Sequence, residues 1–459
     1  MTKKLFSPHP SFKSFSKERK NGMTYNITDY GAEAGGRICT KEIQGTIDAC
    51  FLAGGGEVVI PEGDFYTGGL RLRSGVCLHL LENAHLVGSI DSEDYVGYIN
   101  DEIEPIPEES RDMMVSTALP ECKARSARPF SRWNNAIIRA INAENIAIIG
   151  DKGSVIDGRN CFDEIGEEQY RGPHAINIWF AKNITLRGYT IKDSANWAHA
   201  IQNSQSITCQ KVTVLAGHDG FDVRTCDDVL VEDCRFLTGD DCIAGFDNIG
   251  VTVRNCYFES ACSLLRFGGT DVLVENCHGK DPATYGFRGD LTPEQKRNRA
   301  DTDEKCRHFC LDAYLYYCDL RADVRKTPGN ILFRNCNFDG IKAMLNHPYG
   351  HVWCRNRPLS DITFDNCIFD GLYDVSRTTN PPDEKLTIKI KNCTLIARKG
   401  SEKLPLLESH NLDKVVFENT KFENFEAPTV SSAPECEIEC IDCAEVRFTV
   451  NNSSPAEGF

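Results

Sequence analysis

Short apolar runs with alternating β-branched residues recur along most of the chain, and many of them end in Asn-Cys or Asp-Cys. One aligned position marks each run: it is Tyr189, then Val212, Cys234, Cys256 and Cys277, at steps of 23, 22, 22 and 21 residues. The series resumes with wider steps at positions 336, 367 and 393, each of them a cysteine. The pattern predicts a chain built from repeated short strands.

A period near 22 residues is typical of a solenoid whose coils each hold two or three short strands. Leucine-rich repeats have a similar period, but their Leu-x-x-Leu-x-Leu pattern is missing from this sequence. We therefore expect an all-β fold, a right-handed parallel β-helix, in which residues one period apart stack roughly 4.8 Å apart. The 22 cysteines are expected to be reduced, and those of the repeat to pack in the core as small apolar groups.

The start of the chain departs from the repeat. Residues 1–23 are polar and basic, and we expect a flexible arm there. Ile43, Ile47 and Cys50 then fall on one helix face, with Thr40 before them as a candidate N-cap. This spacing predicts a short helix that caps the open end of the strand stack.

The other boundaries follow from the repeat. A single β-helix domain is expected over residues 24–450, followed by a tail over residues 451–459. The step from Cys277 to Cys336 is 59 residues, which is too long for one ordinary coil. Residues 281–329 are therefore predicted to form a partly helical insert. An insert of this length in a compact protein favours a lid over a functional site.

Charge narrows the range of partners. The chain has 51 Lys and Arg against 67 Asp and Glu, a formal net charge of −16, which disfavours nucleic acids and anionic membranes. The sequence starts without the apolar segment of a signal peptide, and no apolar stretch reaches the roughly 18 residues of a membrane helix. We expect a cytoplasmic protein that needs no metal or other cofactor. The oligomeric state stays open.

Candidate chemistry is concentrated in residues 215–248. Seven residues past the aligned position, Asp219 and Asp241 occupy one column on successive coils, and Asp240 falls one position earlier, in a column with His218. Carboxylates this close repel one another, so the pKa of at least one should be raised. A raised carboxylic acid beside ionised carboxylates is what a glycosidase needs. An inert turn and a Ca²⁺ site are the alternatives.

A second column adds further candidates. Ten residues past the aligned position, His199, Asp222 and Arg266 lie on nearby coils, with Ala244 between the last two. We predict that these polar side chains contact the substrate beside the acids. His199 is also a candidate for orienting Asp222 or for simple packing.

Several of these segments resemble the polygalacturonase family of glycoside hydrolases, family 28. The resemblance rests on residues 142–150, on Ile156-Asp157-Gly158, and above all on the motifs at 217–219 and 239–241. It implies a β-helical enzyme that hydrolyses pectin-like oligosaccharides, containing galacturonate or rhamnose, with inversion. By resemblance, Asp240 protonates the leaving oxygen, while Asp219 and Asp241 hold the nucleophilic water.

Two family motifs are altered, and both affect the expected substrate. Residues 260–262 lack the family's histidine, and the Arg-x-Lys motif retains Arg288 but has Asp290 in place of the lysine. His218 is the candidate to replace the histidine, and Arg266 the missing cation. The insert suggests exo-action. A non-catalytic glycan-binding β-helix and a polysaccharide lyase on the same scaffold remain alternatives.

Overall fold

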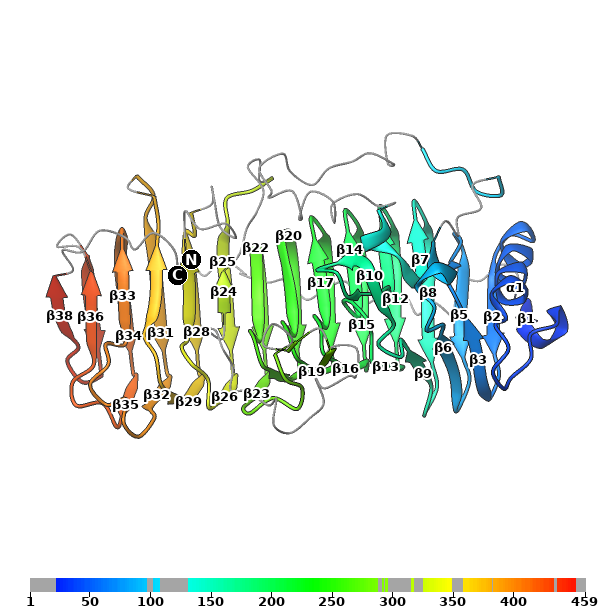
Figure 1. Ribbon diagram of the computed structural model, residues 1–459. Helices are drawn as coiled ribbons and strands as arrows, with labels where there is room; N and C mark the ends of the chain where they lie inside the picture. The colour runs from blue at the N-terminus through cyan, green and yellow to red at the C-terminus, as the bar shows by residue number, and fades with distance from the viewer. Residues whose placement is uncertain are drawn as a thin grey trace.

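The strands of this protein stack into an elongated parallel β-helix, from β1 (Thr24–Asn26) at one end to β38 (Arg447–Val450) at the other (Figure 1). The computed structural model describes residues 22–96, 102–107, 131–287, 291–292, 294–295, 315–317, 325–348, 358–381, 383–432 and 436–450. The predicted arm up to residue 21 and the tail after residue 450 lie outside these ranges. Within them, no helix is long and apolar enough to cross a membrane.

In the described part of the chain, two parallel sheets run along the stack, one of 25 strands and one of 12. The smaller sheet has one strand from each coil, in the order β3 (Gly63–Thr67), β6 (Ala84–Gly88), β9 (Val155–Asp157), β13 (Thr190–Lys192), β16 (Thr213–Ala216), β19 (Arg235–Thr238), β21 (Tyr257–Ser260), β23 (His278–Lys280), β26 (Asn337–Asp339), β29 (Ile368–Leu372), β32 (Thr394–Ala397) and β35 (Lys421–Glu423). The strands that follow it in each central coil are β11 (His174–Trp179), β14 (His199–Gln202), β17 (Phe221–Arg224), β20 (Ile243–Arg254) and β22 (Leu265–Glu275).

Strand register confirms the predicted period. Thr213 of β16 pairs with Arg235 of β19, and Val229 of β18 (Asp227–Glu232) pairs with Val251 of β20. Each pair is one 22-residue coil apart. Residues one period apart are therefore neighbours along the stack, as the columns require.

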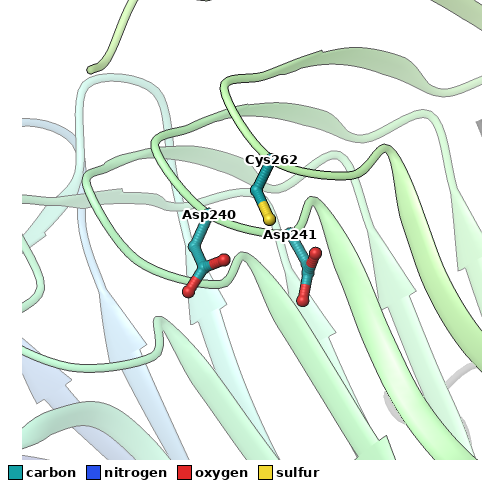
Figure 2. Close-up of side chains that lie close together, drawn as sticks. All are labelled: Asp240, Asp241 and Cys262. Atoms are coloured by element: carbon teal, nitrogen blue, oxygen red, sulfur yellow. The ribbon is translucent and has the colours of Figure 1, made fainter. Parts of the chain in front are cut away.

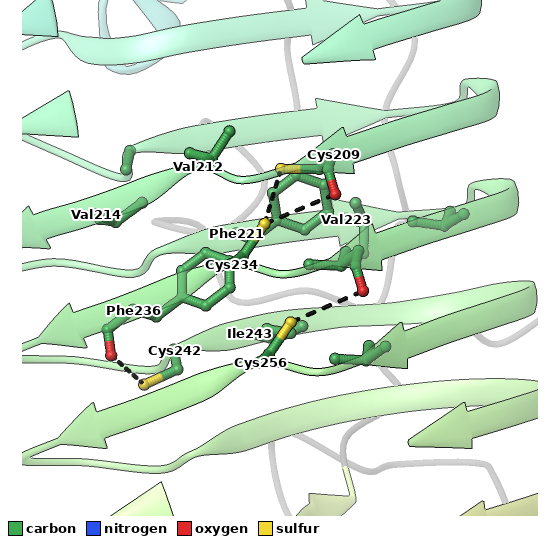
Figure 3. Packing of buried hydrophobic residues seen from close by; sticks show 14 of the residues in the cluster. Cys209, Val212, Val214, Phe221, Val223, Cys234, Phe236, Cys242, Ile243 and Cys256 are labelled. Atoms are coloured by element: carbon green, nitrogen blue, oxygen red, sulfur yellow. Dashed lines mark hydrogen bonds between the residues drawn. The ribbon is translucent and has the colours of Figure 1, made fainter. Parts of the chain in front are cut away.

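A column of buried thiols runs through the core (Figure 3). Cys234, Cys256 and Cys277 are each at most 2% exposed. Each donates its thiol to the carbonyl two residues earlier, as Cys234 does to Glu232 at 3.2 Å. All of the cysteines in the described residues are free thiols. The prediction of reduced, buried cysteines is confirmed for this column, which continues through Cys336, Cys367 and Cys393.

Helix α1 (Thr40–Leu52) covers the N-terminal end of the stack, and it buries Ile43, Ile47 and Cys50 as predicted. The N-cap prediction is wrong. Thr40 is the first helical residue, and its hydroxyl accepts a hydrogen bond from the backbone N–H of Gly68 at 2.7 Å. The side chain thus ties the helix to the first coils instead of closing the helix end.

The 59-residue step forms one coil, against our expectation. β22 pairs with both β24 (Leu315–Tyr317) and β25 (Gly329–Arg334), and β23 pairs with β26. The residues that join β23 to β24, and those that join β24 to β25, lie largely outside the described ranges. Because turns carry no ladder hydrogen bonds, the strands return in register whatever the turn length. Most of the predicted insert lies outside the described residues.

Candidate active site

The acidic pair Asp240 and Asp241 lies in the turn between β19 and β20. Strand alternation would send the two side chains to opposite faces. The turn after Gly239 instead brings both carboxylates together beside the thiol of Cys262 (Figure 2), and one ligand atom from each lies within 4.8 Å of the others. The hydroxyls of Thr238 and Ser260 donate to the carbonyl of Asp240, each at 2.6 Å, and fix the turn.

Asp219 occupies the equivalent turn one coil earlier. The backbone N–H of Gly220 donates to the carbonyl of Asp241 at 2.9 Å, which sets Asp219 beside Asp241 along the stack. The column prediction is therefore confirmed. Asp219 and Asp241 are each 1% exposed, whereas Asp240 is 9% exposed. Of the three, Asp240 is the carboxyl group with the best access to a bound sugar.

The pKa of Asp219 is raised to about 8 from its ordinary value of 3.8. Burial is the main cause, and the negative charge of Asp241 adds to it, while Arg266 opposes the shift. Repulsion and desolvation both disfavour a second buried anion. The prediction of a raised pKa is confirmed, but the raised group is Asp219, which is too buried to protonate a leaving oxygen.

This proton should make stability depend on pH. Between about pH 4 and about pH 8, Asp219 binds a proton in the folded protein but not in the unfolded chain. Its stabilisation is fully present below that window and is lost as pH rises through it. Relative to Asp219→Asn, which cannot titrate, the free energy of unfolding of the native chain should fall by up to about 1.4 kcal/mol per pH unit. Urea unfolding of both proteins across the window measures this. Parallel curves would contradict the raised pKa.

Arg266 lies against the acids and not in an open groove. Its Nε donates to Oδ2 of Asp241, and its Nη2 lies 3.5 Å from Oδ2 of Asp219. The arginine side chain is 16% exposed, against 2% for each aspartate side chain. This cation lies beside the acids as predicted, but its partners in the structure are carboxylates of the protein.

The other predicted contacts differ in their access to a ligand. His218 is 4% exposed, next to Asp219 in sequence, and its ring stacks on Tyr170 with centroids 6.0 Å apart. It stays a candidate beside the acids. Arg288 lies outside the described residues. His199 is fully buried.

The prediction that His199 contacts substrate is wrong. Its side chain points into the core, where Nε2 lies 3.0 Å from the hydroxyl of Tyr189 and Nδ1 lies 2.9 Å from the carbonyl of Gly220. Burial lowers the pKa of His199 to about 4, so the ring is neutral at pH 7. The column slipped by one residue, because Ala200, not His199, pairs with Asp222.

Asp222 also differs from the prediction. Both of its carboxylate oxygens accept hydrogen bonds from Arg224, at 2.7 and 2.9 Å, and the side chain is 1% exposed. The guanidinium of Arg224 stacks 4.2 Å from the ring centroid of Trp197. Asp222 is therefore committed to an internal ion pair and is not an open sugar contact.

Two neighbours of the site were not singled out from the sequence. Cys262 falls six residues past Cys256, in the column of His218 and Asp240, so the repeat alone could have identified it. Arg171 could not be found that way. It lies in an excursion before β11, it is 2% exposed, and it donates to Asn196 at 3.1 Å.

The donor set does not favour calcium. Asp240, Asp241 and Cys262 are the one group of possible metal ligands found among the described residues. Ca²⁺ takes six to eight oxygen ligands, whereas this group offers two carboxylates and a thiol. Arg266 already compensates the charge of Asp241. The geometry therefore fits acid–base chemistry better than a calcium site.

The sequence profile described as glycosyl hydrolases family 28 matches residues 122–263, a range that includes all three acids. Over this range the chain is similar to glycosyl hydrolases family 28, as a divergent relative. The match ends before Arg266 and Arg288, where the sequence departs from the family motifs.

Individual relatives are distant. A probable polygalacturonase of Vitis vinifera is 26% identical over 242 residues, which span 49% of this chain and 45% of that protein, so the chain covers less than half of this relative. An exopolygalacturonase of Platanus acerifolia is 24% identical over 356 residues, 71% of this chain and 84% of that protein. The solved structure of the Yersinia enterocolitica family 28 exopolygalacturonase has 17% identity and a TM-score of 0.62, and covers 92% of this chain and 78% of that one. This likeness confirms the right-handed parallel β-helix.

Proposed function

We propose that this protein is a divergent family 28 enzyme, an inverting glycoside hydrolase that cleaves pectin-like oligosaccharides containing galacturonate or rhamnose. The meeting of Asp219, Asp240 and Asp241 on adjacent coils carries the proposal. Glycoside hydrolysis requires a carboxylic acid for the leaving oxygen and a carboxylate that activates water or attacks the sugar. This cluster supplies both.

Exposure and charge divide the roles among the three acids. Asp240 is the most exposed and is offset from the other two, so it is the general acid. Asp219 and Asp241 share one guanidinium and form the pair that orients the attacking water.

Because Asp219 binds its proton up to about pH 8, the water is activated best when that proton has left. Turnover should therefore rise with pH toward that value.

Stereochemistry is the sharpest point of the proposal. Carboxyl groups lie roughly 6.5–9.5 Å apart in most inverting enzymes and about 5–5.5 Å apart in retaining ones. One oxygen of Asp240 lies within 4.8 Å of one oxygen of Asp241, which is a closest approach of two atoms and not the separation of the carboxyl groups. We assign inversion because Asp241 is paired with Arg266, and a carboxylate held by a guanidinium is a poor nucleophile. The family resemblance implies the same outcome.

The proposed substrate class and the proposed exo mode are supported by the names of the relatives. Polygalacturonase and exopolygalacturonase are the names of two relatives. Described residues at the two ends of the insert contact the coils that hold the acids. At its start, the carbonyl of Gly286 lies against Gly239. Near its end, Arg325 donates to Asp227 at 2.7 Å and to the carbonyl of Asp247 at 2.6 Å. The exo mode itself is proposed from the name of the second relative.

Product analysis tests the function. The purified chain should be incubated with oligogalacturonides, rhamnogalacturonan oligosaccharides and neutral oligosaccharides of matched length. We expect release of single sugar units from one chain end of a pectic substrate, and NMR of the fresh product should show the inverted anomer. A retained anomer would make a carboxylate the nucleophile. An unsaturated product would identify a lyase, and binding without turnover would identify a glycan-binding protein.

A further inference from the structure

Arg266 lies at a position in the stack from which its side chain reaches both the turn of Asp241 and the turn of Asp219. It pairs with Ala244 of β20, which in turn pairs with Asp222 of β17. Asp241 belongs to the coil next to that of Arg266, and Asp219 to the coil beyond it. Neighbouring coils are roughly 4.8 Å apart. The side chain of Arg266 is long enough to reach the acid on the next coil and the acid on the coil beyond it, whereas a short side chain is not.

The contacts of Arg266 are those of an internal clamp. Nε and Nη2 point to different carboxylates, Asp241 and Asp219, and both acids are almost completely buried. A planar guanidinium presents its donors in a fixed fork, whereas a lysine ammonium acts as a point charge. The two carboxylates are thereby held at a defined spacing on neighbouring coils.

We propose that Arg266 is a positioning residue that clamps Asp219 and Asp241 into the pair that orients the attacking water. It would act through these two acids and not by binding the sugar. The catalytic part of this inference rests on the proposed function. The clamp itself rests only on the contacts of the guanidinium.

Charge around the pair explains why a clamp is needed. Asp219 faces acids on its own coil and the next, and one buried guanidinium from an excursion also faces it. The titratable and charged groups packed around the pair are Asp222, His218, Asp240, Cys262, Arg171 and Arg266. Among them, Arg266 is the largest influence that favours the ionised form of Asp219. Without it, two buried carboxylates would repel with less compensation.

Kinetics of Arg266→Met and Arg266→Lys test the positioning role. We expect kcat to fall at least about tenfold in Arg266→Met with KM changed less than twofold, and the acidic limb of the pH profile to move to higher pH. Misplacement of reacting groups by about 1 Å is enough for losses of this size. Arg266→Lys should keep the limb near its native pH, because the charge remains, but should not recover kcat. A raised KM with an unchanged pH profile would instead make Arg266 a substrate ligand.

A matched control is available on the outer face of the same coils. Arg254 donates through Nε to Glu232 on the neighbouring coil, much as Arg266 does to Asp241, but it is 39% exposed. Arg254→Met should leave kcat, KM and the pH profile unchanged. An equal loss in both methionine variants would mean that any lost cross-coil ion pair damages the enzyme, and would overturn a specific role for Arg266.

Stability measurements decide the clamp even if no hydrolysis is found. Arg266→Met should unfold at lower urea than the native chain near pH 8, with a smaller difference near pH 5. Adding Asp219→Asn to Arg266→Met should recover most of the loss, because one of the two repelling charges is then removed. No recovery in the double variant would overturn the clamp. An inactive wild-type chain with a coupled Arg266–Asp219 pair would refute only the proposed function.

Discussion

Replacing Asp240 with asparagine should lower turnover on the best oligosaccharide by about 10²–10⁴-fold, because an amide cannot give a proton to the leaving oxygen. The fold should persist. The hydrogen bonds that Thr238 and Ser260 donate to the backbone carbonyl of Asp240 are unchanged by the substitution. Turnover measured by reducing-end release, together with a thermal unfolding curve, separates loss of chemistry from loss of structure.

The control for this variant is Asp370→Asn. Asp370 lies in β29, several coils away from the site, and its side chain is exposed. It should turn over substrate like the native chain. If Asp240→Asn also hydrolysed substrate at the native rate, Asp240 would not be the acid, and the roles of the three aspartates would have to be reassigned.

Gly239→Ala should cost about 10²-fold in kcat/KM, although it replaces no catalytic side chain. A Cβ at this position would lie 2.5 Å from the carbonyl oxygen of Gly286 and 2.7 Å from that of Gly217. Both obstacles are backbone atoms, so the turn that carries Asp240 and Asp241 has to shift. Displacements of about 1 Å at a reacting group are enough for such a loss. We also expect about 1–3 kcal/mol of destabilisation from the forced contact.

Gly45→Ala provides the matched comparison, because it makes the same chemical change where there is room. Gly45 is exposed in helix α1, and a Cβ there meets no heavy atom within 4 Å. Alanine should stabilise the protein by about 0.5–1 kcal/mol and leave hydrolysis unchanged. Steady-state kinetics and urea unfolding of both variants distinguish the two sites. Native kinetics in Gly239→Ala would show that the tight turn does not position the acids.

Most of the fold could be predicted from the periodicity of the sequence, because every coil of the stack has to bury a side chain at the same position. Cys234, Cys256 and Cys277 face the core for one reason, and the spacing of such residues reveals the register. The prediction failed where the coil length changed. One additional residue in the turn before β14 shifted His199 out of the column of Asp222. The 59-residue step between Cys277 and Cys336 hid the return strand β24 in the same way.

The sequence predicted which acidic side chains lie side by side, because the columns of the repeat determine which residues are neighbours. Asp219 and Asp241 share a column, and Asp240 sits beside them, as expected. Ion pairing was not predictable, because the column count places a side chain but does not choose its partner. Arg266 and Asp222 were both expected to meet a sugar, and both instead pair with charges of the protein.

The single long coil that includes β24 and β25 has a consequence for how this protein can change over evolutionary time. Loop-closure entropy grows only with the logarithm of loop length, about 0.6 kcal/mol for each doubling. Strand pairing across the coil is kept on both sides of its excursions. Segments can therefore lengthen or diverge there at little cost to folding, while the acids on the preceding coils stay fixed. Changes in these segments are thus separated from the geometry of the acidic turns.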